Sequence, residues 1–158
     1  MGEKVMSDEV SKSGRKTISF DNLSESMLAM MDKALELRRE FELEKENAVR
    51  EGKLEGEKRI SKSMLILKNR NGIVTLEWRK LRRVYKGTIY SEYIPKRRGV
   101  IIYDIATLRK KFEPWEMEIV EKYEKLARHL RLDIQELRRS EMKEARRLKK
   151  EAEAKKEA

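Results

Sequence analysis

The spacing of apolar residues predicts an amphipathic helix in the first third of the chain. Between Leu23 and Val49, apolar side chains recur every three or four positions, and charged residues fill the positions between them. Asn22 lies three residues before Glu25, which is the spacing of a capping box at a helix start. Glycine weakens a helix by about 1 kcal/mol relative to alanine, so the helix is expected to end near Gly52 and Gly56. The apolar stripe consists of Met27, Met30, Ala34, Leu37, Phe41 and Ala48.

The period then changes to that of strands. Two β-rich runs, Met64–Arg70 and Ile73–Val84, flank Asn71-Gly72, the pair that most readily adopts the positive φ angles of a tight hairpin turn. After a turn at Lys86-Gly87, the run "TIYSEYI" predicts a third strand that ends at Pro95, which has no N–H to donate to a neighbouring strand. The following run "VIIY" is a candidate fourth strand. A meander of three or four antiparallel strands is therefore expected.

The two faces of the second predicted strand differ in polarity. Alternate side chains of a strand point to opposite faces. One set is expected to pack under the helices and consists of Val74, Leu76 and Trp78. The other set is expected to face outward and consists of Thr75, Glu77 and Arg79. Apolar and charged residues no longer alternate at Lys80–Arg82, so a bulge or twist is expected there.

Two further helices are predicted after the sheet. Asp104 is a suitable N-cap for a short helix through "IATLRKKF", and Pro114 suits the first position of a long helix. Beyond Leu137 the stripe of the long helix thins, so its end is expected to fray. The order of elements predicts an α+β fold in which helices cover one face of a small sheet. The stripe of the long helix consists of Trp115, Ile119, Tyr123, Leu126, Leu130, Ile134 and Leu137.

The chain divides into four segments, and its charge is concentrated in one of them. We expect a disordered arm (1–20), a helix with a linker (21–60), a basic sheet with a short helix (61–112) and a long helix with a charged tail (113–158). Residues 61–112 hold 14 basic and 3 acidic side chains, whereas residues 1–60 hold 12 and 14, and residues 113–158 hold 13 and 12. The net charge of +10 therefore comes essentially from the sheet segment. This concentration indicates an anionic partner, with nucleic acid ahead of an anionic membrane surface.

The residue inventory argues against catalysis. The chain has no cysteine and one histidine, His129, which has no evident acidic partner in the sequence. It contains no phosphate-binding Gly-rich loop and no Ser/His/Asp set, so we expect neither enzymatic activity nor a cofactor or metal. The first residues contain no apolar signal core, and no run of 18 apolar residues occurs, so a cytoplasmic protein outside the membrane is expected.

The basic meander is the candidate binding surface. A small sheet backed by helices has the breadth to enter the major groove of double-stranded DNA. Basic strand residues also discourage edge-to-edge aggregation, but a net charge of +11 in 52 residues exceeds what that role requires. Strand tyrosines such as Tyr85, Tyr90 and Tyr93 either stack on unpaired bases or lie half-buried in the sheet. The residues expected to contact DNA are Arg70, Asn71, Thr75, Arg79, Arg82, Arg83, Lys86, Tyr90, Lys96, Arg97 and Arg98.

Other partners and assemblies stay open at this point. RNA binding is one alternative, and a helical scaffold whose basic sheet docks on an acidic protein or lipid surface is another. Both long helices have stripes longer than the sheet can cover. They are expected to pair either within the chain as a hairpin or between chains as a coiled coil. A homodimer through the helices would present two basic surfaces to a two-fold DNA site.

The stretch from Leu76 to Glu124 carries the residues of a known family. Its features are Trp78-Arg79 in a strand, Lys86-Gly87 at a turn, Ile94-Pro95-Lys96 before Gly99 and Tyr103, and Leu108–Lys111 before Pro114-Trp115-Glu116. This pattern resembles the MobI-type auxiliary mobilisation proteins of conjugative plasmids and integrative conjugative elements, over roughly Met64–Arg139. Residues 1–60 show no such resemblance.

The resemblance implies a small bacterial factor that acts at a transfer origin. Such a factor helps a relaxase or another transfer protein to initiate DNA processing without catalysing it. The strand and helix segment is also similar in outline to the arm-binding domains of tyrosine recombinases, which read DNA through a sheet. That second likeness concerns architecture alone.

Overall fold

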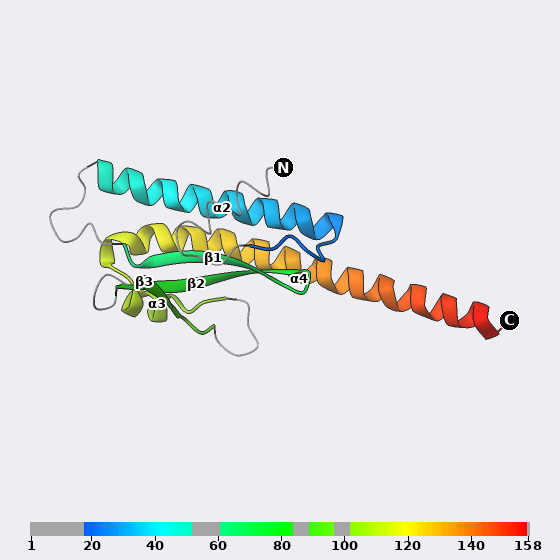
Figure 1. Cartoon of the computed structure of the whole chain (residues 1–158). Helices are drawn as coiled ribbons and strands as arrows, with labels where there is room; N and C mark the ends of the chain where they lie inside the picture. Colours follow the sequence, from blue (N-terminus) through cyan, green and yellow to red (C-terminus); the bar gives the residue numbers. More distant parts are fainter. Residues whose placement is uncertain (1–17, 52–60, 84–88, 97–101, 158) are drawn as a thin grey trace.

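The computed structural model contains a three-stranded antiparallel sheet with helices packed on one face (Figure 1). The structure describes residues 18–51, 61–83, 89–96 and 102–157. Helix α2 (Glu25–Arg50) precedes the strands β1 (Ser63–Arg70), β2 (Ile73–Arg83) and β3 (Ile89–Tyr93), which are followed by α3 (Ile105–Lys111) and α4 (Pro114–Glu157). The predicted α+β order of elements is confirmed.

Helix α2 is capped by Ser24, so the capping box predicted at Asn22 is wrong. The Ser24 hydroxyl accepts a hydrogen bond from the Met27 N–H at 3.0 Å, which satisfies one of the free donors of the first turn. Asn22 has a φ of 62° and belongs to a turn before the helix. The helix ends at Arg50, shortly before Gly52, as the weak helix propensity of glycine predicts.

The hairpin turn at Asn71-Gly72 is present as predicted. Both residues have positive φ angles, 53° and 86°, as a two-residue hairpin turn requires. Asn69 supports the turn, since its Oδ1 accepts from the Gly72 N–H at 2.8 Å and its Nδ2 donates to the Ser19 and Asp21 carbonyls. The turn is therefore fixed against the segment that leads into α2.

The strand pairing is continuous, so of the bulge or twist predicted near Lys80–Arg82, the bulge is absent. β1 and β2 pair residue for residue along β1, and β2 and β3 pair from Arg79 to Arg83. Lys80 and Arg82 keep their alternation because polar partners are present on that face, where the Arg82 Nε donates to Glu92 at 2.9 Å.

The predicted fourth strand is not found in the described part of the chain, where the sheet has three strands. Ile102 and Tyr103 belong to no strand. Val100 and Ile101 lie outside the described residues, as do Val84 and the predicted Lys86-Gly87 turn.

The core lies between the sheet and the helices and is centred on Trp78. This side chain is fully buried and makes edge contacts with Phe41 at 5.1 Å and Phe112 at 6.1 Å between ring centroids. Phe41 in turn contacts Tyr123 at 5.4 Å. α2, β2, α3 and α4 thus meet around one indole, which confirms the prediction that Trp78 anchors the sheet to the helices.

Two fully buried glutamates of α4 also tie the helix to the sheet. Glu116 accepts hydrogen bonds from the backbone N–H groups of Lys62 and Ser63, at the start of β1, and from that of Glu113. Glu124 accepts from the Trp78 indole at 2.9 Å and from the buried Arg131 at 2.9 Å. For both carboxylates, protein donors replace water.

The helices α2 and α4 form an antiparallel hairpin within one chain. Ser24 at the start of α2 donates to Glu141, whereas Lys122 early in α4 pairs with Glu44 late in α2 at 3.0 Å. Of the two pairings left open by the sequence, the structure contains the one within the chain. The stripe prediction was wrong for Leu126, which is 43% exposed, because α4 must face both α2 and the sheet. The core positions of α4 are Met117, Val120, Tyr123, Ala127, Leu130 and Ile134.

The last part of α4 projects beyond the other elements (Figure 1). The hydrogen bond between Ser24 and Glu141 is the farthest one along α4 that joins it to another described element. All residues from Met142 to Glu157 are exposed and helical, so the predicted fraying does not appear before Glu157. No described helix is long and apolar enough to cross a membrane.

Candidate nucleic-acid interface

The outer face of β1 and β2 carries five polar side chains, which lie beside the apolar Met64, Ile66, Ile73 and Leu81. The polar ones are Lys68, Arg70, Thr75, Glu77 and Arg79. Strand alternation places them opposite the core-facing residues of the same strands, as the parity of β2 predicted. This face is less open than the sequence suggests, because Glu77 is 4% exposed and the side chains around it are partly covered. The polar side chains of the outer face thus form a packed charged layer next to an apolar one.

Glu77 lies at the centre of the outer face and pairs with three cations. Its carboxylate is 2.7 Å from Arg70, 3.5 Å from Lys68 and 3.8 Å from Arg79. One negative charge thus offsets three positive charges, and the layer retains a net charge of +2. Since the Lys68 and Arg70 side chains are 39% and 57% exposed, the excess charge is available to an external anion.

Arg79 is the most enclosed of these cations. Its Nε donates to the Ser91 hydroxyl at 2.9 Å, and a terminal nitrogen donates to the Ser91 carbonyl at 3.3 Å. Its guanidinium lies 5.8 Å from the centroid of the Tyr93 ring, over the neighbouring strand. With its side chain 18% exposed, Arg79 mainly ties β2 to β3.

Arg82 and Tyr90 lie on the opposite face of the sheet from Arg70, Thr75 and Arg79. The two residues form a cross-strand pair, and strand alternation places both on the face that carries Trp78. Hydrogen bonding to the Glu92 carboxylate raises the pKa of Arg82. Glu92 also lies 3.7 Å from Lys111 of α3. The predicted contact residues therefore do not form one continuous surface.

Lys96 follows β3 and lies beside the ring of the buried Tyr103. Burial lowers the pKa of Lys96, and the positive charges of Arg131 and Arg70 add to this effect while Glu77 opposes it. Its Nζ is 5.9 Å from the ring centroid of Tyr103. The structure thus brings Lys96 close enough to Arg70 and Glu77 for their charges to interact.

The remaining predicted contact residues differ in what they offer. Asn71 is exposed at the tip of the hairpin, but the Thr75 hydroxyl is buried and has no hydrogen-bond partner among the described residues. Arg83 pairs with Ile89 through the backbone, and its side chain lies outside the described part of the chain. The predictions for Lys86, Arg97 and Arg98 also fall outside the described residues.

The strand tyrosines are more exposed than a sheet anchor would be. Tyr90 is 48% exposed and Tyr93 is 52% exposed, so both side chains are half-buried, which is one of the two alternatives left open by the sequence. Tyr85 lies outside the described residues. Both exposed tyrosines stand on the edge strand β3, where Tyr93 lies on the outer face and Tyr90 lies on the face that carries Trp78.

Lys68 is a candidate contact residue that the sequence did not reveal. Arg70 was predicted to contact DNA because it adjoins the hairpin turn. Lys68 lies two residues earlier on the same face and pairs with the same carboxylate, that of Glu77. Applying the alternation of β2 to β1 would have identified it. In the described part of the chain, no group of three or more His, Asp or Glu residues is arranged to hold a metal ion.

Comparison with known proteins gives one family. The family model described as MobI protein matches residues 30–147, which is well over half of the 158 residues. The match includes most of α2, so the interpretation that residues 1–60 lack family features was wrong from residue 30 onward. No curated protein and no solved structure matches the chain.

Proposed function

The chain belongs to the MobI protein family, and from this premise we propose that it is a non-enzymatic DNA-binding accessory protein of conjugative DNA transfer. In this proposal it binds duplex DNA at or near the transfer origin and assists a relaxase in starting DNA processing. The family match supports a role in mobilisation. The DNA contact and its location are our inference from the charge and the geometry of the sheet.

One observation carries the proposal, namely the excess positive charge on the outer face. Lys68 and Arg70 pair with Glu77, which neutralises only part of their charge, and the partly buried Lys96 adds a further positive charge whose field reaches Glu77. The β1–β2 hairpin has the width of a two-stranded ribbon, which the major groove of B-DNA admits. Phosphate oxygens can replace the Glu77 carboxylate as partners of the exposed lysine and arginine.

The test is a DNA titration with a variant that lacks these charges. Replacing Lys68, Arg70 and Lys96 with Gln is expected to weaken binding to duplex transfer-origin DNA at least about tenfold at 100 mM salt. The slope of log affinity against log salt should also fall by about 0.9 for each phosphate that the variant no longer neutralises. The matched control replaces Lys33, Arg39 and Arg50, three exposed cations of α2, with Gln. Equal affinities for the two variants would contradict the proposal.

The same titration separates the alternatives. Competition by RNA or single-stranded DNA that exceeds competition by duplex DNA would favour the RNA-binding or strand-binding interpretation. Partner binding that persists at high salt, without retention of nucleic acid, would favour a helical scaffold. The homodimer stays a prediction, since the stripes of α2 and α4 already pair within one chain. Sedimentation of the free and DNA-bound protein measures the number of chains.

A further inference from the structure

The projecting part of α4 is a second exposed surface with a strong charge. Between Arg138 and Lys150 it carries seven Lys or Arg and two Glu. All thirteen residues are exposed except Glu141, which is partly buried next to Ser24. We call Arg138–Lys150 the basic arm. The net charge of residues 113–158 does not reveal the basic arm, because acidic residues in the first part of α4 offset its positive charge.

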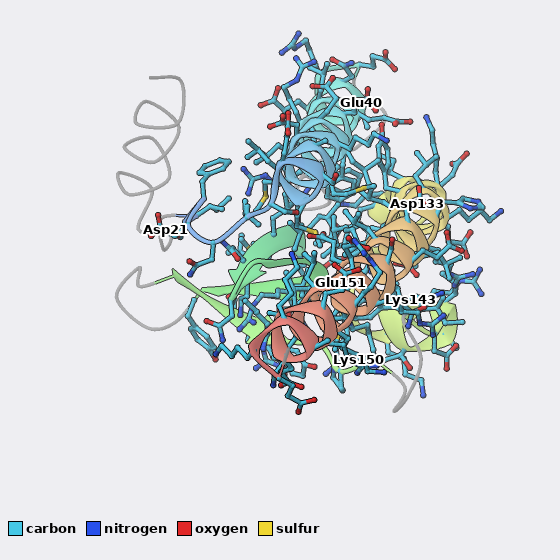
Figure 2. All side chains as sticks on the ribbon, turned by 90° about the vertical axis from the view of Figure 1, so that its right-hand side faces the viewer. Asp21, Glu40, Asp133, Lys143, Lys150 and Glu151 are labelled. Carbon is cyan, nitrogen blue, oxygen red and sulfur yellow. The ribbon has the colours of Figure 1, made fainter. Side chains whose placement is uncertain are left out.

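The cations of the basic arm lie on one side of the helix. Successive residues of an α-helix are rotated by about 100°, which places all seven cations within about half of the circumference. Glu141 and Glu144 fall on the other half. Figure 2, which looks along α4 from its far end, shows Lys143 and Lys150 on the side away from α2. The cations are Arg138, Arg139, Lys143, Arg146, Arg147, Lys149 and Lys150.

Most of this charge is not neutralised within the described structure. Arg147, at the margin of the basic half, pairs with Glu144 and Glu151. The other six cations form no ion pair with a described residue. Six positive charges held on a helix about 20 Å long create a strong local field that an extended polyanion can neutralise.

The basic arm has too little apolar surface to bind a membrane or a hydrophobic groove in a partner protein. Helices that bind a membrane surface or a hydrophobic groove present several large apolar side chains on one face. Beyond Glu141 the arm offers only Met142 and Leu148 as large apolar residues, together with alanine. Its chemistry therefore favours a partner that is recognised by charge alone.

Duplex DNA matches the dimensions of the arm. An α-helix with its side chains is about 10–12 Å wide, and the major groove of B-DNA is about 12 Å wide. The arm leaves the body at the end where the hairpin turn lies, since Gly72 adjoins Asn22 and Ser24 contacts Glu141. The start of the basic arm and the tip of the β1–β2 hairpin therefore lie at the same end of the molecule.

We propose that the basic half of Arg138–Lys150 binds the phosphate backbone of duplex DNA, as a surface separate from the sheet. This inference rests on the proposed function, and it adds a second binding surface to the outer face. If the arm does not bind DNA, the outer face alone makes the contact with DNA.

The test uses the full chain with Lys143, Arg146, Lys149 and Lys150 replaced by Gln. These residues are exposed, and glutamine favours helices nearly as well as lysine, so the fold is expected to persist, as circular dichroism will check. The affinity for a duplex of about 30 base pairs should fall at least about tenfold at 100 mM salt, and the salt slope should decrease by about 0.9 for each phosphate released. The matched control replaces Lys33, Arg39, Arg50 and Lys125, four exposed cations elsewhere, with Gln.

The outcomes separate this inference from the proposed function. If the arm variant binds like its control while the Lys68, Arg70 and Lys96 variant binds weakly, the inference is overturned and the proposed function stands. If the unmodified chain does not bind duplex DNA, both fail. Loss of binding to vesicles that contain anionic phosphatidylglycerol, with unchanged DNA affinity, would assign the arm to a membrane and overturn the inference. Independent weakening by both variants supports two surfaces.

Discussion

The indole Nε1 of Trp78 donates a hydrogen bond to the Glu124 carboxylate at 2.9 Å, and neither side chain is exposed to solvent. The same carboxylate accepts from the Tyr103 N–H, and Arg131 links it to the Leu76 carbonyl. Among the described residues, β3 pairs with β2 only from Arg79 onward, and no other strand lies along this edge of β2 before Arg79. Side chains of α4 and the Tyr103 hydroxyl satisfy its backbone groups instead.

Replacement of Glu124 by Ala should therefore destabilise the protein severely. It would leave the buried Arg131 without its carboxylate and the Trp78 indole without an acceptor, and the loss of one partner of a buried ion pair costs about 3–5 kcal/mol. Urea denaturation measures the change in the free energy of unfolding. Glu118→Ala, at an exposed position of the same helix, should change it by less than about 0.5 kcal/mol. A Glu124→Ala cost below about 1 kcal/mol would show that the network contributes little.

The sequence predicted the elements well, but it did not predict the buried charges. Alternation along β2 and the Asn71-Gly72 pair are local signals, and both were confirmed because backbone geometry alone determines them. The burial of Glu116 and Glu124 depends on donors that lie 21–54 residues away in the chain. Such partners meet only in the folded state, so no local pattern reveals them.

Gly72→Ala tests the hairpin turn. The residue has a φ of 86°, and a Cβ built there would lie 2.3 Å from the carbonyl oxygen of Asn22. Backbone strain and this clash together are expected to cost about 2 kcal/mol or more of stability. Asn71→Gly, at the neighbouring position with φ of 53°, is the matched control and should be nearly neutral. Equal thermal midpoints for the two variants would mean that the turn can move away from Asn22.

Replacing Arg79 should lower stability more than replacing Arg70 does. Replacing Arg70, in contrast, should weaken DNA binding more than replacing Arg79 does. Arg79→Ala removes two hydrogen bonds to Ser91 and the contact with Tyr93, so it should lower the free energy of unfolding by about 1–2 kcal/mol. Arg70→Gln removes a more exposed cation and should change stability by less than about 1 kcal/mol, yet weaken DNA binding several-fold. Urea denaturation and anisotropy titration of both variants give the comparison. The reverse order would mean that Arg79 is the principal DNA contact.

The candidate site shows why the net charge of a long segment does not identify the residues that contact a partner. Counting by thirds identified the sheet segment, but it averaged the basic arm of α4 with the acidic residues that precede it. The count also treated Arg79 and Arg82 as equivalent, although they lie on opposite faces and each has an acidic neighbour. The exposure and the ion pairing of a side chain depend on tertiary structure. The sequence therefore predicts the sign of the partner's charge better than it predicts which residues contact the partner.

The buried phenol of Tyr103 should make stability fall in alkaline solution. Burial raises the pKa of Tyr103 from 10.0 to about 12, so the folded state keeps a proton that the unfolded state releases above pH 10. The folded state then binds more protons than the unfolded state, and the free energy of unfolding decreases as the pH rises from about 10 to about 12. The contribution is fully present below about pH 10 and is lost at higher pH. Burial and Glu44 also raise the pKa of Tyr123, so part of the decrease should remain when Tyr103 is replaced.

Tyr103→Phe isolates the part that belongs to this phenol. The variant loses the hydroxyl that accepts from the Trp78 N–H, so it should be less stable than the unmodified chain at about pH 9. Because phenylalanine does not titrate, its stability should decrease less between about pH 9 and about pH 11.5, and the two curves should converge. Urea denaturation at several pH values measures both curves. Tyr93→Phe removes an exposed phenol and serves as the control. Parallel curves for Tyr103→Phe and the unmodified chain would show that Tyr103 ionises equally in the folded and unfolded states.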